Sequence, residues 1–148
     1  MFLSAESLRT GGYVLSPDGL VLVNPASIDL RVAEDIDLDP GQFTLASTIE
    51  TVAMPLDRIG FVSGKSSWAR EGLLVEAAGL VDPGFSGTIT LELFNMAAES
   101  VEIPAGMRIA QLSVAVLDAP TSLPYPLVGH YHGQSGPTPS WRRIRREC

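Results

Sequence analysis

Turn-forming residues divide this chain into short pieces, and this punctuation limits its fold more than any other feature. The turns combine glycine with proline or aspartate, as in Ser16–Gly19, Asp39–Gly41, Asp82–Gly84 and Pro104–Gly106. Between them lie short runs with alternating or β-branched character, which is typical of strands. Many short strands at spacings of about ten residues predict a mostly β domain: a sandwich, a jelly roll or a distorted barrel.

The individual strands and helices can be placed from the same pattern. Strands are predicted over residues 13–15, 19–23, 28–32, 42–47, 58–62, 87–94, 100–103 and 108–117. One or two short helices also fit the sequence. The first would run from Ser4, a good N-cap, to a stop at Gly11 and Gly12. The second would span residues 66–71, and the backbone amides at its start would form an anion site.

Length and composition predict a single folded domain over residues 1–148, since 45% of the residues are hydrophobic and 18% are charged. From residue 125 onward the chain is rich in glycine, proline and serine, so residues 125–148 are expected to form a flexible arm, part of which docks through Trp141. No apolar run is long enough for a membrane span, and the first residues do not resemble a signal peptide. Cys148 is the single cysteine. Without an internal disulfide, a cytoplasmic protein is expected.

Charge is distributed unevenly along the chain. The tail over residues 142–148 holds four arginines and one glutamate and has a charge of +3. Because the net charge of the whole chain is −7, the remaining body carries −10. A body this acidic repels nucleic acid, and no nucleic-acid partner is expected. The basic tail is interpreted as a solvated terminus or a subunit contact.

The segment Gly64–Arg70 contains the residue types that bind phosphate. It offers a glycine, the hydroxyls of Ser66 and Ser67, and the only lysine of the chain, Lys65. Its spacing is not that of a Walker loop. Arg70 follows the serines by three to four residues, so on a helix it would share their face, and the two cations could share the charge of a polyphosphate. Without Arg70, a solvated loop would be the simpler interpretation.

Two acidic residues are candidates for proton transfer. Glu92 interrupts an apolar strand, where partial burial would tune its carboxylate for acid/base work. The alternative is that Thr88, Thr90 and Glu92 merely form the solvent face of the strand. Asp82 precedes Pro83–Gly84, where aspartate commonly stabilises a turn.

The histidines and the cysteine do not form a recognisable metal site. His130 and His132 flank Tyr131, but the sequence supplies neither a third histidine nor the cysteines of a zinc deaminase. No zinc is therefore expected.

Six ordered blocks of the sequence resemble the dCTP deaminase branch of the trimeric dUTPase superfamily. They are distributed along most of the chain: Asn24–Arg31, Phe43–Glu50, Gly64–Arg70, Asp82–Asn95, Pro104–Ser113 and Tyr131–Ser140. The resemblance implies a distorted β jelly roll that forms a homotrimer, with active sites at the subunit interfaces. Three differences stand out. Lys65 replaces the usual arginine, the segment between Arg70 and Asp82 is one residue short with Ala77 in place of threonine, and the chain is short before Phe43.

The resemblance also implies a role for each site residue. Glu92 would be the general acid/base, oriented by Arg70, and Asp82 would orient a hydrolytic water. The residues expected at the phosphates are Lys65, Ser66, Ser67 and Gln111, with Tyr125, His130 and Gln134 in an arm that closes over the nucleotide. Those expected around the sugar and base are Ala78, Gly79, Asp82 and Phe85.

The implied reaction is hydrolytic deamination of dCTP to dUTP and ammonia, with Mg²⁺ held through the triphosphate and no metal on the protein. An alternative is the bifunctional enzyme, which also cleaves the α–β phosphoanhydride and gives dUMP. The segment Ala78–Asp82 resembles the corresponding segment of that enzyme. A dUTPase without deaminase activity is a further alternative, but its reaction would not require Glu92 as general acid/base. A catalytically silent trimer that binds a nucleotide is the remaining alternative.

Overall fold

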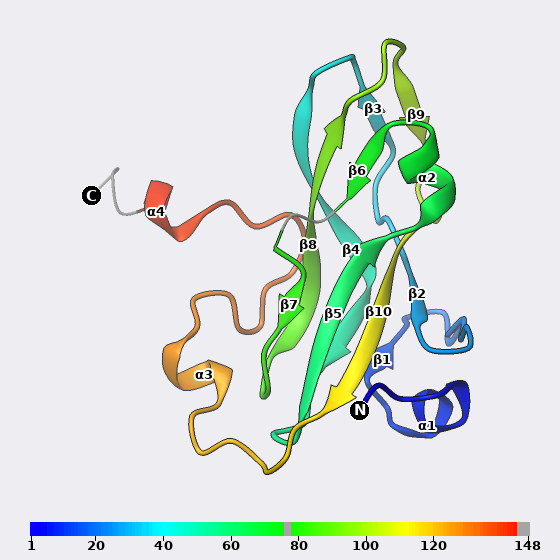
Figure 1. Ribbon diagram of the computed structural model, residues 1–148. Helices are drawn as coiled ribbons and strands as arrows, with labels where there is room; N and C mark the ends of the chain where they lie inside the picture. Colours follow the sequence, from blue (N-terminus) through cyan, green and yellow to red (C-terminus); the bar gives the residue numbers. More distant parts are fainter. Residues whose placement is uncertain (76–77, 145–148) are drawn as a thin grey trace.

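The structure, a computed structural model, describes residues 1–75 and 78–144 and consists mainly of antiparallel β-sheets (Figure 1). The first sheet has the order β1 (Val14–Leu15), β4 (Phe43–Ala53), β8 (Ser86–Asn95), β6 (Leu73–Val75). The second has the order β2 (Ile28–Arg31), β10 (Arg108–Val116), β5 (Arg58–Gly64), β7 (Leu80–Val81). A small third sheet pairs β3 (Ile36–Leu38) with β9 (Val101–Ile103). The predicted mostly β jelly-roll architecture is confirmed.

The core lies between the sheets because apolar residues alternate along the strands. On β8, Ile89, Leu91 and Leu93 are buried, whereas the residues between them are only partly covered. Leu30 of β2 and Leu112 of β10 enter the same core from the second sheet. Full burial of each such side chain stabilises the fold by about 2 kcal/mol. This alternation leaves Thr88, Thr90 and Glu92 together on the opposite face of β8.

A buried ion pair occupies an irregular stretch of β4. The pairing of β4 with β8 shifts register between Ser47 and Thr51, and Glu50, in this interval, reaches Arg31 of β2. The Arg31 Nε–H donates to Glu50 Oε1 at 2.6 Å, and the Arg31 backbone N–H donates to Oε2 at 2.9 Å. Both side chains are almost fully buried. Removing one partner of such a pair costs roughly 3–5 kcal/mol because the other charge remains buried.

The same arginine holds the turn that follows β1. Arg31 donates to both carboxylate oxygens of Asp18, at 2.8 and 3.0 Å, and to Ser16 Oγ at 2.7 Å. These hydrogen bonds, from Arg31 first and then from Ser16, hold the pKa of Asp18 well below its ordinary value. The Asp18 carboxylate also accepts the N–H of Leu20. The strand predicted over residues 19–23 is wrong: after the turn at Asp18 the segment is irregular, with a single bridge from Val23 to Ile28.

Four short helices lie at the margins of the sheets, and none in the described part of the chain is long and apolar enough to cross a bilayer. The two predicted helices are present as α1 (Ala5–Thr10) and α2 (Ser66–Arg70). The sequence did not predict α3 (Tyr125–Val128) or α4 (Trp141–Ile144), both in the C-terminal arm. Ala77 and the basic residues 145–148 lie outside the described residues.

Candidate active site

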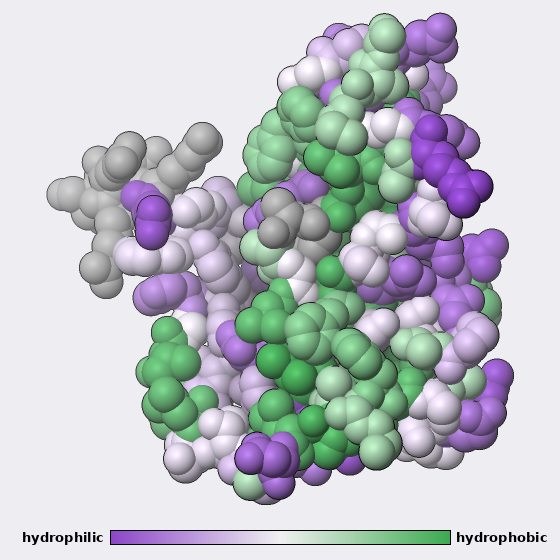
Figure 2. Space-filling view, in the orientation of Figure 1, coloured by the Kyte–Doolittle hydropathy of each residue, from purple (hydrophilic) through white to green (hydrophobic). Residues whose placement is uncertain are grey.

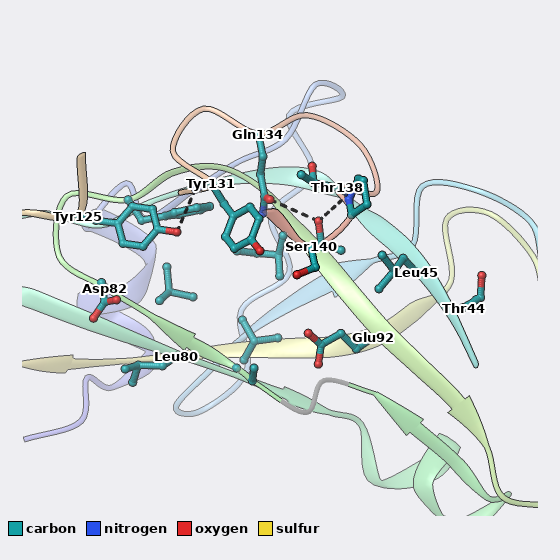
Figure 3. A pocket seen from close by; sticks show the side chains of 18 of the residues that line it. Thr44, Leu45, Leu80, Asp82, Glu92, Tyr125, Tyr131, Gln134, Thr138 and Ser140 are labelled. Atoms are coloured by element: carbon teal, nitrogen blue, oxygen red, sulfur yellow. Dashed lines mark hydrogen bonds between the residues drawn. The ribbon is translucent and has the colours of Figure 1, made fainter. Parts of the chain in front are cut away.

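A cavity of about 630 Å³ lies beside β8, under the arm (Figure 3). Its walls come from β4, β8, the segment leading into and out of β7, and the arm. The lining residues are Phe43, Thr44, Leu45, Val62, Ala78, Gly79, Leu80, Val81, Asp82, Phe85, Ile89, Thr90, Glu92, Tyr125, Tyr131, Gln134, Thr138, Pro139 and Ser140. The volume and the mixture of apolar walls with a few polar groups are typical of a small-molecule site.

Glu92 brings a carboxylate into this cavity. It lies on the same face of β8 as Thr90, opposite the core, and its carboxylate points into the hollow (Figure 3). The residue is half-buried, so the interpretation of this face as plain solvent-exposed surface is not supported. A half-buried carboxylate that faces a cavity can accept and return protons to a bound molecule.

The turn after β7 forms the wall that carries Asp82. The turn closes with a hydrogen bond from the Phe85 N–H to the Asp82 carbonyl at 3.1 Å, as its Asp-Pro-Gly sequence predicts. Reciprocal bonds join it to the end of β4, from the N–H of Gly84 to the Met54 carbonyl and from the N–H of Met54 to the Phe85 carbonyl. Phe85 is thereby buried, and Tyr125 packs edge-on against its ring at 5.4 Å between centroids.

The arm covers the cavity with two tyrosines and a glutamine. The Tyr131 N–H donates to the Tyr125 hydroxyl at 3.2 Å (Figure 3), and the Gln134 side chain donates to the Thr88 carbonyl at 2.7 Å. His130 does not line the cavity. Its ring instead stacks on Trp141, with 4.3 Å between centroids and 33° between planes.

The residues predicted to bind phosphate form a separate cluster. Lys65, Ser66, Ser67, Arg70 and Gln111 are all outside the lining of the cavity. They gather instead around the junction of α2 with β10, where the Lys65 N–H donates to the Ile109 carbonyl and the Trp68 indole to the Arg108 carbonyl. Ser66, Ser67 and Arg70 are exposed there.

A buried carboxylate anchors the lysine of this cluster. Asp29 Oδ1 accepts hydrogen bonds from Lys65 Nζ at 2.5 Å and from Asn24 Nδ2 at 2.6 Å, and its other oxygen lies 3.3 Å from Arg108 Nη1. The Asp29 side chain is buried, and that of Arg108 is 56% exposed. Two cations around one carboxylate leave a net positive charge, which suits an anionic ligand.

The structure brings seven of the thirteen predicted site residues together in this cavity, beside several residues that the sequence did not predict. The seven are Ala78, Gly79, Asp82, Phe85, Glu92, Tyr125 and Gln134. Thr44, Leu45, Thr90 and Ser140 were not predicted to contribute, although Thr90 could have been inferred because it shares a strand face with Glu92. Asp29 was also not predicted. It is an acidic residue in a four-residue strand whose residues are all buried, and an acid in such a strand could have been chosen as a candidate site residue.

Comparison with known proteins identifies the family of the chain. Residues 22–117 match the family model described as dCTP deaminase-like. A Mycobacterium avium protein named "dCTP deaminase, dUMP-forming" is 49% identical over 180 aligned positions, covering 95% of both chains. The alignment is longer than this 148-residue chain, so the relative has residues that this chain lacks. An Acidothermus cellulolyticus protein of the same name is 46% identical over 76% of this chain, which spans only 62% of that relative's length.

Solved structures that resemble the chain include dUTPases. The native EIAV dUTPase superposes with a TM-score of 0.62 at 25% identity, over 75% of this chain and 92% of that structure. The dUTPase of Staphylococcus bacteriophage 80alpha with dUPNHPP has a TM-score of 0.63 at 20% identity, over 73% and 83% of the two chains. The second likeness establishes the fold alone.

Proposed function

The chain belongs to the dCTP deaminase-like family, and we propose that it hydrolyses dCTP to ammonia and dUMP. The sequence favoured dUTP as the product, with dUMP as the alternative. The relatives' names support the alternative better, since those reported above are called dUMP-forming. The observation that carries the proposal is the half-buried Glu92 carboxylate, which faces a cavity that also holds Asp82.

Glu92 would perform the deamination. Its carboxylate takes a proton from a water as that water adds to C4 of cytosine, and it passes the proton to ring N3. It then takes the remaining proton from the C4 hydroxyl and delivers it to the exocyclic amine, so the C4 carbonyl forms as the C4–N bond breaks and ammonia leaves. The arm over the cavity would keep bulk water away from these transfers.

Asp82 would serve the second hydrolysis. A water oriented by its carboxylate attacks the α-phosphorus, and pyrophosphate leaves with the electrons of the α–β bond. The backbone of Ala78 and Gly79 would frame the base, and the buried ring of Phe85 would pack against the deoxyribose. In the described part of the chain no three His, Cys, Asp or Glu side chains form a metal cluster. Mg²⁺ would therefore be held through the triphosphate.

A second copy of the chain would complete the site. The cavity contains the two acids, whereas the phosphate-binding candidates Lys65, Ser66, Ser67 and Arg70 lie outside it. A triphosphate bound beside two carboxylates needs cations, so we propose that a neighbouring chain presents this cluster, with Gln111, to the cavity. Arg70 would then orient Glu92.

The surface is consistent with assembly into the homotrimer that the family resemblance implies. Figure 2 shows apolar residues gathered on the face that carries β5 and β7 in Figure 1. Phe61 of β5 and Leu80 of β7 are exposed, and Phe2 packs against Phe61 at 5.7 Å. Exposed apolar surface of this kind commonly marks a protein interface.

Product analysis tests the proposal directly. The protein is incubated with dCTP and Mg²⁺, with an EDTA control, and the nucleotides are separated while ammonia and pyrophosphate are assayed. Formation of dUMP, ammonia and pyrophosphate is expected. Accumulation of dUTP would remove the diphosphatase step, hydrolysis of dUTP but not dCTP would identify a dUTPase, and no reaction with either would overturn the proposal.

A further inference from the structure

The arm binds to the part of the β8 edge that β6 does not pair. In the described residues, β6 pairs with β8 only at Leu93–Asn95. Farther along the same strand, the backbone groups bond to the arm instead. The Ser86 carbonyl accepts the N–H of Gly133 at 2.6 Å, and the Thr88 N–H donates to the Gln134 carbonyl at 3.1 Å. Edge groups of this kind form a natural docking surface for an extended segment.

Two threonine hydroxyls continue the contact on the cavity face of β8. Thr88 Oγ1 accepts the N–H of Gly136, and Thr90 Oγ1 accepts the N–H of Thr138, each at 3.1 Å. Side chains two residues apart lie on one face of a strand, so the hydroxyls present a regular pair of acceptors. The donating residues of the arm are also two residues apart. Because the spacing of the donors equals that of the acceptors, both hydrogen bonds form in a single register of the arm against β8.

Gly87 permits this close approach. A Cβ atom at this position would lie 2.9 Å from the backbone oxygen and 3.0 Å from the backbone nitrogen of Gln134. Both distances are too short for a side chain to be accommodated without moving the arm. The glycine between Ser86 and Thr88 therefore allows the backbones of arm and strand to touch.

We propose that Thr88 and Thr90 are positioning residues that set the register of the arm over the candidate active site. Held in this register, the arm places Tyr131, Gln134 and Ser140 along the cavity into which Glu92 points (Figure 3). The inference deepens the proposed function and rests on it for the link to turnover. The docking of the arm itself does not depend on the proposed reaction.

The test replaces both hydroxyls with methyl groups. Valine has the shape and the strand preference of threonine but cannot accept the arm's N–H groups. Each lost hydrogen bond is worth about a factor of five, so in the Thr88→Val/Thr90→Val protein the KM for dCTP should rise roughly twentyfold, with a smaller change in kcat. The Thr88→Ser/Thr90→Ser protein keeps both hydroxyls and should behave like the original chain.

Two measurements report on the arm without any activity. Hydrogen–deuterium exchange should become faster at Gly136 and Thr138 in the valine protein, and chymotrypsin should cleave sooner after Tyr131. Thr10→Val, on α1 away from the arm (Figure 1), is the matched control and should change nothing. Melting temperatures identify any general loss of fold.

The outcomes separate the two proposals. An arm that remains equally protected in the valine protein would overturn the positioning role, as would an arm that loosens equally in the serine protein. If the arm loosens only in the valine protein while the original chain does not deaminate dCTP, the docking role stands and the proposed reaction fails.

Discussion

Glu92 depends for its chemistry on which face of β8 it occupies. Residues 86–95 alternate between core and cavity, so the carboxylate is carried into the cavity by the same periodicity that buries Leu91 and Leu93. The other acidic residue of the cavity, Asp82, comes from a turn and not from a strand. The two acids thus enter the cavity from separate elements, and the proposed function assigns a separate hydrolytic step to each.

Replacement of Glu92 with glutamine is expected to abolish deamination. The amide keeps the shape of the side chain but cannot take a proton from water, so kcat for ammonia release should fall by a factor of roughly 10² to 10⁴. Binding of dCTP, measured by calorimetry, should change little. Glu102→Gln, at an exposed position of β9, is the control. Near-normal turnover by the Glu92→Gln protein would contradict the assignment.

In the proposed function, the arm is the element whose contacts bear most directly on catalysis. It lies along β8 from Gly133 to Thr138 and brings Tyr125 against the buried ring of Phe85. Bonds to a strand edge hold it, with little burial of its own side chains. An element attached in this way can open at modest cost and admit substrate.

Removal of residues 125–148 should weaken substrate use more than stability. Without the arm, Tyr125 and Gln134 no longer cover the cavity, so KM for dCTP should increase roughly ten- to a hundredfold in steady-state assays. The melting temperature should stay close to that of the whole chain, because the hydrophobic core between the two sheets remains intact. Unchanged kinetics after truncation would show that the arm does not close the site.

The sequence predicted the long elements better than the short ones. Strands β4, β8 and β10 have enough alternating residues to be recognised, and Asp-Pro-Gly identified the turn at Asp82. The strands β3, β6 and β7 have only two or three residues and exist because longer neighbours supply their hydrogen bonds, so they carry no periodic signal of their own.

The candidate site, like the fold, could be predicted from the sequence only in part. Single residues of unusual chemistry, such as Glu92 and Lys65, could be chosen from the sequence. Their contacts could not, because the Lys65–Asp29 pair joins residues 36 positions apart and the Thr88–Gly136 bond joins residues 48 positions apart. Such contacts are determined by the packing of the sheets, which local patterns do not encode.

At the scale of the whole molecule, the acidic residues and the cations of the candidate site are separated. The cavity holds Glu92 and Asp82, while Lys65 and Arg108 meet around Asp29 elsewhere on the surface. In the proposed assembly, each complete site therefore combines two chains, although the structure shows each arm lying on the cavity of its own chain.

Mixed assemblies test whether the arm acts within one chain. Glu92→Gln chains are combined with chains that lack residues 125–148, and deamination is compared with that of each parent. If each arm serves its own cavity, no mixed site has both Glu92 and its arm, so activity should not exceed the sum of the parents. Substantial recovery would mean that the arm reaches a neighbouring cavity. Light scattering confirms that the two chains have assembled.

The Arg31–Glu50 pair carries a lesson for redesign. The Glu50 charge is enclosed by protein and neutralised by Arg31, whereas Arg31 pairs with both Glu50 and the Asp18 carboxylate of the neighbouring turn. An apolar replacement at position 31 alone would leave the Glu50 anion in the interior without its partner, and one at position 50 alone would leave Arg31 with Asp18 as its remaining carboxylate. An engineer who wishes to alter this part of the sheet must exchange both residues in a single step, and must supply a new anchor for the loop beside them.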